Sequence, residues 1–585
     1  MKFKETWDKA LQIKNETSSL KRIQQYMVVP FTPSAGILEW VDRTIPLGEY
    51  LLGSARNGGA HGRYGVGDWT FLHCREYMMN EKDTRKAFVK ICDNFRLNLI
   101  DNFFSKQTVE QILSSLIALY FRSMAEHGSG AALHVAVFPW LAFGHMLPFL
   151  QLSKSLAKRG HRVSFLSTPR NIARLPEIPP DVAPLIEFVP FTFSSVDNLP
   201  PEAESTADLL PEQVQYLKKA LDGLQSAFSR FLRATRPDWL VIDFCQHWAP
   251  EIASDLGIPC AFLSIYNAAC LFFLLEKMAG DIQPTRPEEL TKPPGNLPFP
   301  TTVSFRLHEA KDVIWNYRDN ASGISDGRRL SAIVKDSDLV AFRGCFEQDA
   351  TWLSLFRTRI CGGSKPVVPL GLLPPPLEEA TAPDSDVGEP SATFRWLSEQ
   401  SPRSVVYVAF GSEATLREEQ ERELASGLDL SATPFLWATR KPSGGVERRS
   451  SGLVVGGWVP QLEILRHGAV GAFLTHCGFS SAVESFQFGH PLVMLPLAID
   501  QGLMARQFEE MKVGTEVARN EEDGSFTGED VAAAIRKVMV EEEGKALRSN
   551  VEKLQEVFAN RELHESYIDT FVQLLRDLKH KKTFE

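Results

Sequence analysis

The chain has 585 residues, and at roughly 150 residues per domain this length suggests three or four domains. A hydrophobic content of 44% with 23% charged residues is typical of a globular protein and excludes wholesale disorder, and the net charge of −10 argues against nucleic-acid binding, which needs a basic face. The eight cysteines are scattered without a CxxC pair or a Cys/His cluster, so we expect no metal site, no disulfide framework and a reducing compartment.

The first 123 residues include VVPFTPSAGILEWVDRTIPLGEYLLG and, further on, GGAHGRYGVGDWTFLHCREYMMNEKDTRKAFVKICDNFR. Residues 20–96 are similar to part of the catalytic region of the ATM-type phosphatidylinositol-3-kinase-like protein kinases, a strand–hinge segment with the helices after it. Such a kinase needs a GDRH catalytic loop and a metal-binding DFG, and neither follows before Met124. We therefore expect residues 1–123 to be a partial, non-catalytic kinase-like extension from a fusion or a chimeric gene model. A kinase-derived interaction module is the alternative.

We expect neither an export signal nor a membrane span. The first twenty residues have no apolar h-region, and the most apolar runs, 112–121 and 268–275, fall well short of the roughly 20 residues that span a bilayer. The sequence therefore predicts a cytoplasmic protein without integral membrane association.

Strands and helices alternate from residue 133 onward. Met124 opens MAEHGSGAALHVAVFPW, which is typical of a free-standing α/β protein beginning at its first buried strand, although Met124 as an ordinary helix residue after IALYFRS is the alternative. Apolar runs beside helices predict buried strands at 134–138, 239–243, 404–410, 471–476 and 492–496. These runs predict two doubly wound, Rossmann-like α/β domains joined by a linker rich in Pro, Ser and acidic residues, 370–393.

The most informative segment is the 44 residues from Trp458 to Gln501, WVPQLEILRHGAVGAFLTHCGFSSAVESFQFGHPLVMLPLAIDQ. It predicts a helix, a buried strand ending at His476, a turn at Gly478 and a helix beginning at Ser480 or Ser481. The backbone N–H groups and the positive end of such a helix suit an anion such as a diphosphate. Because many helices begin with Ser for capping alone, only the order and spacing of the whole segment make the prediction specific.

In that order and spacing the segment resembles the signature box of the plant family-1 UDP-glycosyltransferases. The resemblance implies that Trp458 stacks on uracil, that Gln461 meets the base or ribose, and that Glu484 binds the ribose hydroxyls. An indole suits a flat base, and a carboxylate suits a vicinal diol. The alternative for Trp458 or Glu484 taken alone is surface packing or solvation.

The same resemblance assigns the remaining donor residues. His476 and Ser481 would face the phosphates, and Asp500 and Gln501 would hold the sugar hydroxyls, while Gly478, at the turn, also belongs to the UDP-sugar site. Upstream, Phe410-Gly411-Ser412 is similar to the family's phosphate-side Gly-Ser loop, with a generic strand-end turn as the alternative.

Two departures from the family pattern lie in this region. The family's HCGWNS is HCGFSS here, so Phe479 replaces a Trp and Ser480 replaces an Asn, and two donors near the sugar and phosphates are lost. The segment between Arg440 and Trp458 is also shorter than usual. A catalytically impaired nucleotide-sugar binder is therefore the alternative to an active enzyme.

A catalytic pair is implied by resemblance in the amino-terminal half. His145 in FPWLAFGHMLPF follows the first strand at a helix start, and Asp243 in PDWLVIDFCQHW ends a later strand. In the family such a histidine is the base and such an aspartate orients it. A surface histidine, and an aspartate that caps a helix at 248–256, are the alternatives.

The resemblance implies an inverting, metal-independent two-domain glycosyltransferase (GT-B type) with no cofactor, whose partners are a UDP-sugar and a small-molecule hydroxyl acceptor. Gln501 favours UDP-glucose, with UDP-rhamnose or UDP-xylose open, and flavonoid or terpenoid glycosides are the expected acceptors. We expect a monomer. The implied parts are a kinase-like fragment (1–123), an acceptor-binding domain (124–369), the linker (370–393), a UDP-sugar-binding domain (394–562) and a C-terminal helix returning to the acceptor domain (563–585).

Overall fold

The structure is a computed structural model that describes residues 28–32, 35–38, 132–278, 282–374, 391–411, 416–439, 446–449 and 451–584. The chain separates into two compact units, Met1–Leu113 and Ser114–Glu585. In the first unit the described residues form an antiparallel pair of strands, β1 (Val28–Thr32) and β2 (Ala35–Leu38). The rest of the predicted kinase-like segment lies outside the described residues, so its similarity to a kinase stays a prediction.

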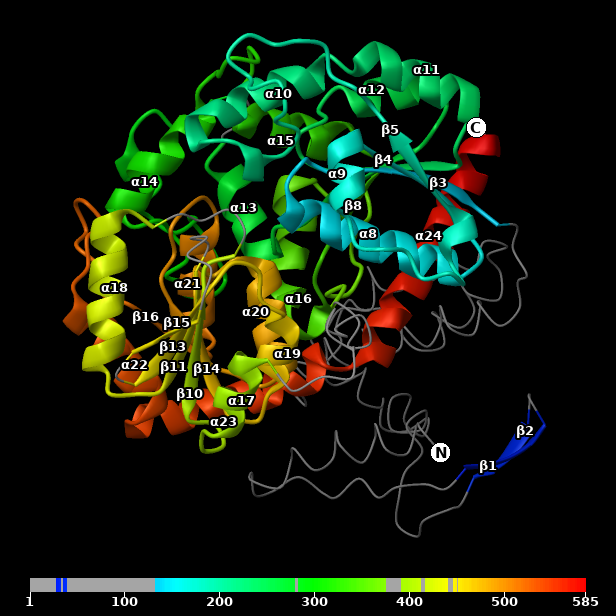
Figure 1. Cartoon of the computed structure of the whole chain (residues 1–585). Helices are drawn as coiled ribbons and strands as arrows, with labels where there is room; N and C mark the ends of the chain where they lie inside the picture. Colours follow the sequence, from blue (N-terminus) through cyan, green and yellow to red (C-terminus); the bar gives the residue numbers. More distant parts are fainter. Residues whose placement is uncertain are drawn as a thin grey trace. The chain divides into compact units, whose positions relative to one another are not determined.

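The second unit begins with a seven-stranded parallel sheet of order β5-β4-β3-β6-β7-β8-β9 (Figure 1). Its strands are β3 (His134–Phe138), β4 (Arg162–Ser167), β5 (Ile186–Pro190), β6 (Trp239–Ile242), β7 (Cys260–Ser264), β8 (Leu339–Phe342) and β9 (Val367–Pro369). The strands are apolar on both faces because helices cover both faces. The strand order reverses between β3 and β6, and such a reversal opens a crevice at the carboxyl ends of the strands.

The helices around this sheet connect its parallel strands. They are α8 (Phe143–Lys158), α9 (Pro169–Arg174), α10 (Val214–Asp222), α11 (Gln225–Thr235), α12 (Ala249–Asp255), α13 (Ala268–Glu276), α14 (Leu307–Val313), α15 (Asp326–Asp336) and α16 (Phe346–Leu355). Leu370, Leu372 and Leu373, at the start of the predicted linker, are buried in this part of the fold.

A second seven-stranded sheet has the order β12-β13-β11-β10-β14-β15-β16. Its strands are β10 (Val405–Ala409), β11 (Phe435–Thr439), β12 (Val446–Arg448), β13 (Gly452–Gly456), β14 (Val470–Thr475), β15 (Leu492–Met494) and β16 (Gly514–Glu516). All are parallel except β12, which pairs antiparallel with β13 at the edge. The order reverses between β10 and β14, so the structure confirms the prediction of two doubly wound α/β domains.

The helices of the second domain follow the same alternation. They are α17 (Ala392–Ser398), α18 (Glu418–Leu430), α19 (Gln461–Arg466), α20 (Phe479–Gln487), α21 (Gln501–Glu510), α22 (Gly528–Met539), α23 (Glu542–Phe558) and α24 (Arg561–Phe584).

The last helix, α24, packs on the amino-terminal sheet (Figure 1, red). Phe571 and Leu575 are buried in the same core cluster as Val137 of β3. Trp239 Nε1, at the start of β6, donates to the Leu575 carbonyl at 2.9 Å. The final residues of the chain therefore complete the core of its amino-terminal domain.

A buried ion-pair cluster joins the two domains. Arg506 of α21 donates to both carboxylate oxygens of Glu516 at 2.7 Å and also pairs with Glu309 of α14. Arg306, just before α14, donates to Glu516 at 3.1 Å. Because residues of both domains share these charges, the cluster fixes the register of one domain against the other.

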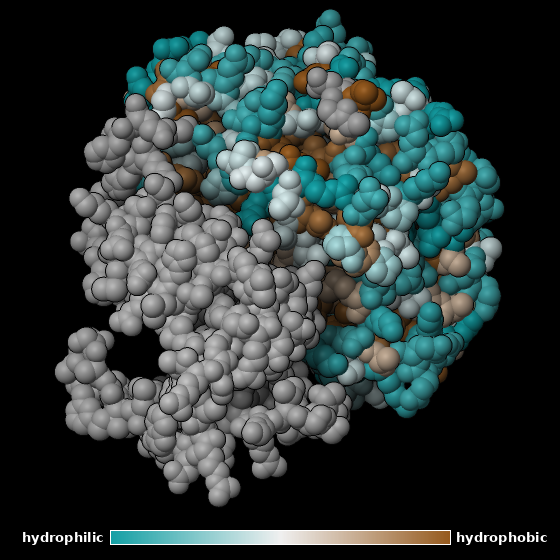
Figure 2. Space-filling model, turned by 180° about the vertical axis from the view of Figure 1, so that it is seen from behind, coloured by the Kyte–Doolittle hydropathy of each residue, from teal (hydrophilic) through white to brown (hydrophobic). Residues whose placement is uncertain are grey.

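The described surface is largely hydrophilic in Figure 2, and the hydrophobic residues visible there gather mainly in a recess. Among the described helices, none is both long and apolar enough to cross a membrane. The described cysteines, at positions 245, 260, 270, 345, 361 and 477, are buried.

Candidate active site

His145 and Asp243 meet where the strand order of the amino-terminal sheet reverses. Asp243 directly follows β6, and His145 is in the first turn of α8, which follows the neighbouring strand β3. His145 Nδ1 lies 2.7 Å from Asp243 Oδ2, and the side chains are 16% and 1% exposed, respectively. The structure thus brings together the two residues that the sequence predicts as a catalytic pair, with the acid buried behind a partly accessible imidazole.

Backbone donors hold the Asp243 carboxylate in place. Oδ2 also accepts from the Trp140 N–H at 3.0 Å, and Oδ1 accepts from the Phe244 N–H at 2.7 Å. The N-cap of α12 is Trp248 and no side chain caps that helix, which excludes the alternative that Asp243 caps α12. Because an ionised carboxylate only accepts, His145 carries its proton on Nδ1, which leaves the lone pair on Nε2.

Two side chains of the predicted nucleoside site are bonded to each other. Gln461 Nε2 donates to Glu484 Oε2 at 2.6 Å, and the buried Tyr407 hydroxyl donates to Gln461 Oε1 at 3.3 Å. Burial raises the pKa of Glu484, while Gln461 and the Arg343 guanidinium oppose that shift. Trp458, in the loop before α19, is 77% exposed and presents an indole face to solvent. This arrangement suits a flat base beside a diol, and the individual roles stay predictions.

The turn from β14 into α20 packs closely around His476. A Cβ on Gly411 or on Gly478 would approach the His476 ring to 2.8 or 2.5 Å, so both positions require glycine. Cys477, between His476 and Gly478, adopts a left-handed backbone with φ of 66°, which turns the chain sharply into the helix. No side chain caps α20. Its first N–H groups and positive end are therefore available to an anion.

His476 and Ser481 lie at this turn, as the sequence predicts for the phosphate side. Burial lowers the pKa of His476 to about 4, so the ring is neutral at neutral pH and can donate only one hydrogen bond. Ser481 is buried in the first turn of α20. Ser412 and residues 440–445 lie outside the described residues, so the role of Ser412 and the effect of the short loop stay predictions.

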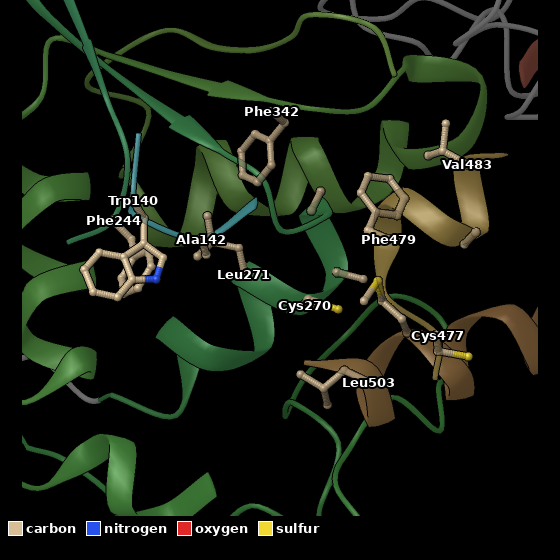
Figure 3. Packing of buried hydrophobic residues seen from close by; sticks show 14 of the residues in the cluster. Trp140, Ala142, Phe244, Cys270, Leu271, Phe342, Cys477, Phe479, Val483 and Leu503 are labelled. Atoms are coloured by element: carbon tan, nitrogen blue, oxygen red, sulfur yellow. The ribbon is translucent and has the colours of Figure 1, made fainter. Parts of the chain in front are cut away.

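The two residues that depart from the family pattern contact the other domain. Phe479 is 5% exposed and belongs to an apolar cluster that also contains Phe342 of β8 and Cys270 of α13 (Figure 3). The Ser480 hydroxyl accepts from Arg343 Nη1 at 2.6 Å. Sequence reasoning missed Arg343, although it follows the apolar strand LVAF just as Asp243 follows WLVI.

The predicted sugar-binding residues lie where a strained loop enters α21, with Asp500 at the N-cap and Gln501 as the first residue of the helix. Ile499 has a φ of 52°, which is unusual for a β-branched residue, and it directly precedes Asp500. Gln501 Oε1 accepts from the backbone N–H groups of Leu497 and Ala498 at 2.8 and 2.9 Å. The side-chain oxygen of Gln501 therefore holds the loop, and only the side-chain NH₂ group remains to meet a sugar.

Asp500 links the two halves of the site. Burial raises the pKa of this half-buried carboxyl to about 6, and the neighbouring His145 in the other domain partly opposes the shift. Its backbone carbonyl lies 3.9 Å from Cys270 Sγ of α13. The predicted sugar residues of one domain therefore lie beside the predicted base of the other. Within the described residues, no group of three or more His, Cys, Asp or Glu side chains could hold a metal ion.

Comparison with known proteins gives the family. A family model described as UDP-glucoronosyl and UDP-glucosyl transferase matches residues 384–565. UDP-glycosyltransferase 91D1 of Stevia rebaudiana is 45% identical over 461 residues, which cover 76% of this chain and 92% of its own. The chain belongs to the UDP-glycosyltransferase family. It is an enzyme of the plant type within that family, and the family binds a UDP-sugar and an acceptor.

Further matches agree with this assignment. The soyasaponin III rhamnosyltransferase of Glycine max is 39% identical over 455 residues, which cover 76% of this chain and 95% of its own. The crystal structure of Glycyrrhiza uralensis UGT73P12 complexed with glycyrrhetinic acid 3-O-monoglucuronide matches with a TM-score of 0.63 at 22% identity, over 77% of this chain and 97% of its own. The fold of residues from 132 onward is thus the two-domain glycosyltransferase fold predicted from the sequence.

Proposed function

We propose that this UDP-glycosyltransferase inverts the anomeric centre of UDP-glucose while transferring glucose to a hydroxyl group of a glycosylated plant metabolite, such as a flavonoid or terpenoid glycoside. The observation that carries the proposal is the His145–Asp243 pair, with a separation of 2.7 Å, facing Asp500 of the other domain. A base with its orienting acid on one side and polar sugar-binding groups on the other is what direct transfer requires.

The chemistry follows from the protonation states. A neutral acceptor hydroxyl is a weak nucleophile, so His145 Nε2 takes its proton as the oxygen attacks the anomeric carbon. Asp243 holds the imidazole and stabilises the imidazolium that forms. The bond from the anomeric carbon to the diphosphate breaks in an oxocarbenium-like transition state, and a single displacement converts an α-linked donor into a β-linked product.

The leaving diphosphate would lie at the start of α20. There the uncapped N–H groups and the helix dipole oppose the charge that builds up on the β-phosphate oxygen as the bond breaks. This is electrostatic stabilisation by groups that are already in place, and it requires no rearrangement at the moment of reaction.

The acceptor and the donor sugar are inferred from relatives and from the predicted box. The Glycine max relative is named for soyasaponin III, which supports a saponin-like acceptor, and for rhamnose, which makes UDP-rhamnose the second donor candidate. Gln501 supports glucose by resemblance, and its NH₂ group is the part of the side chain not used by the loop.

A transfer assay tests the proposal. The full chain is incubated with UDP-glucose, UDP-rhamnose or UDP-xylose and a panel of flavonoid and terpenoid glycosides, and the anomeric configuration of each product is read by NMR. We expect a β-glucoside that is absent with His145→Ala. An α-glucoside formed from UDP-glucose, or equal turnover in the His145→Ala variant, would contradict the mechanism. UDP binding without any turnover would favour an impaired nucleotide-sugar binder.

A further inference from the structure

Arg343 is a buried cation at the boundary between the two domains. It follows β8 of the amino-terminal sheet, and its side chain is among the largest that are fully buried, with 2% exposed. Nε donates to the Leu372 carbonyl at 2.7 Å, and Nη1 donates to the Ser480 hydroxyl at 2.6 Å. Its guanidinium also lies 5.5 Å from the Phe479 ring centre. Figure 3 shows that Phe342 and Phe479, which directly precede Arg343 and Ser480, lie in the same apolar cluster.

This cation is poorly compensated. Among the described residues, no carboxylate forms an ion pair with Arg343, and no acceptor is bound to Nη2. Burial lowers its pKa to about 10, and the Glu484 carboxylate only partly opposes that shift. Taking a guanidinium out of water is unfavourable unless an anion is near. A group kept at this cost, with one nitrogen unbonded, indicates a negative partner that binds beside it.

The geometry of Ser480 points to where that partner binds. A hydroxyl has one hydrogen to donate, and its oxygen already accepts from Arg343. The hydroxyl hydrogen is therefore left to donate to another group. Ser480 lies in the first turn of the uncapped helix α20, and Glu484 lies four residues later on the same helix face. An anion at the start of α20 would thus accept from the Ser480 hydroxyl and face the Arg343 charge.

We propose that Arg343 is a positioning residue for the diphosphate of the nucleotide sugar, acting from the acceptor domain on the donor domain. It fixes the Ser480 hydroxyl as a donor toward the phosphates and brings a positive charge to the start of α20. The inference rests on the proposed function, because it requires the diphosphate to bind at that helix end.

The reaction itself makes this charge more useful as it proceeds. The acceptor oxygen bonds to the anomeric carbon and loses its proton to His145, while the electron pair of the broken glycosidic bond stays on the β-phosphate oxygen. The leaving diphosphate therefore gains negative charge in the transition state. Arg343 should stabilise that state more than the bound donor, so its loss should lower kcat as well as raise KM.

Titration of the full chain with UDP and with uridine tests the proposal, since the two ligands differ by the diphosphate. We expect Arg343→Met to weaken UDP by about 10- to 100-fold while uridine affinity stays within about twofold. Arg343→Lys keeps the charge without the planar fork and should recover part of the UDP affinity. Ser480→Ala should weaken the binding of UDP but not of uridine. In the Arg343→Met background it should lower UDP affinity little further, because the two residues act together.

Arg329 offers a matched control. It is also fully buried, but it pairs with Asp222 within the amino-terminal domain. Arg329→Met should lower the melting temperature without changing the ratio of UDP to uridine affinity. Equal losses of both ligands in Arg343→Met, or UDP affinity unchanged from wild type, would overturn the role of Arg343. Failure of the wild-type chain to bind UDP at all would instead refute the proposed function.

Discussion

Replacing Asp243 by Asn should nearly abolish turnover while UDP binding survives. The carboxylate accepts from three donors, the N–H groups of Trp140 and Phe244 and Nδ1 of His145. An amide has one acceptor oxygen, so in either orientation its NH₂ faces a donor. If NH₂ lies where Oδ2 was, His145 must move its proton to Nε2, and that nitrogen can no longer accept one. If NH₂ lies where Oδ1 was, it faces the Phe244 N–H and the imidazolium loses its counter-charge.

The first arrangement removes the base and the second weakens it, and the size of the effect follows. Loss of general-base catalysis lowers kcat by about 10²–10⁴-fold. One buried donor left without an acceptor should also lower the free energy of unfolding by about 1–3 kcal/mol. The affinity for UDP should not change, because the predicted nucleotide residues belong to the carboxyl-terminal domain and Asp243 to the amino-terminal one.

The measurement combines steady-state kinetics, calorimetric titration with UDP and urea unfolding. His145→Ala is the control, and the double variant should be no slower than the slower single variant because the pair acts as a unit. The reasoning is refuted if the folded Asp243→Asn protein keeps kcat within tenfold of wild type, or if UDP affinity falls in parallel with kcat.

Other expectations concern charge, the strained loop and the amino-terminal extension. Because burial raises the pKa of Asp500 to about 6, its carboxyl becomes protonated below that pH. The KM for UDP-glucose should therefore rise as pH falls through 6, while the Kd of UDP should not. Asp500→Asn should remove this pH dependence of the KM. Gln501→Glu keeps an oxygen that can accept from the loop and loses the NH₂ donor, so it should weaken UDP-glucose binding without changing stability if Gln501 contacts the sugar. If Gln501 only holds the loop, Gln501→Glu should leave UDP-glucose affinity unchanged and Gln501→Ala should lower stability. Asp349 is buried without a hydrogen bond of ordinary geometry, and burial raises its pKa to about 7. Because the Asp349 carboxyl loses its proton at lower pH in the unfolded chain than in the folded one, stability should fall as pH rises from about 4 to 7. In urea unfolding at pH 8, Asp349→Asn should therefore be more stable than wild type by up to about 4 kcal/mol. A variant lacking residues 1–123 should keep the UDP affinity of the full chain, since every described site residue lies after residue 113, and aggregation of the shortened chain would contradict this.

The elements of the site that sequence could predict are those governed by strand ends. The crevice of a doubly wound sheet lies at the carboxyl ends of its strands, so the first polar residues after HVAVF and WLVI are natural candidates, and His145 and Asp243 do meet there. The same argument applied to LVAF would have found Arg343. The residues that carry the family resemblance do not include Arg343.

Other features depend on contacts that the sequence does not display. The burial of Phe479 follows from the packing of one domain on the other, where it shares an apolar cluster with Phe342 and Cys270, so a tryptophan at this position would need more space inside a filled interface. The bonds from Gln501 to the backbone follow from the left-handed turn at Ile499, which no local pattern predicts.

The position of α24 has a consequence for the order in which the protein folds. Domains generally fold in sequence as they leave the ribosome. Here Phe571 and Leu575 complete the core beneath β3, and the Leu575 carbonyl accepts from Trp239 at the start of the strand that carries Asp243. The amino-terminal domain is therefore translated long before its core can close, and the carboxyl-terminal domain can complete its sheet first. A nascent chain arrested before residue 561 would expose that unfinished apolar surface to chaperones and proteases.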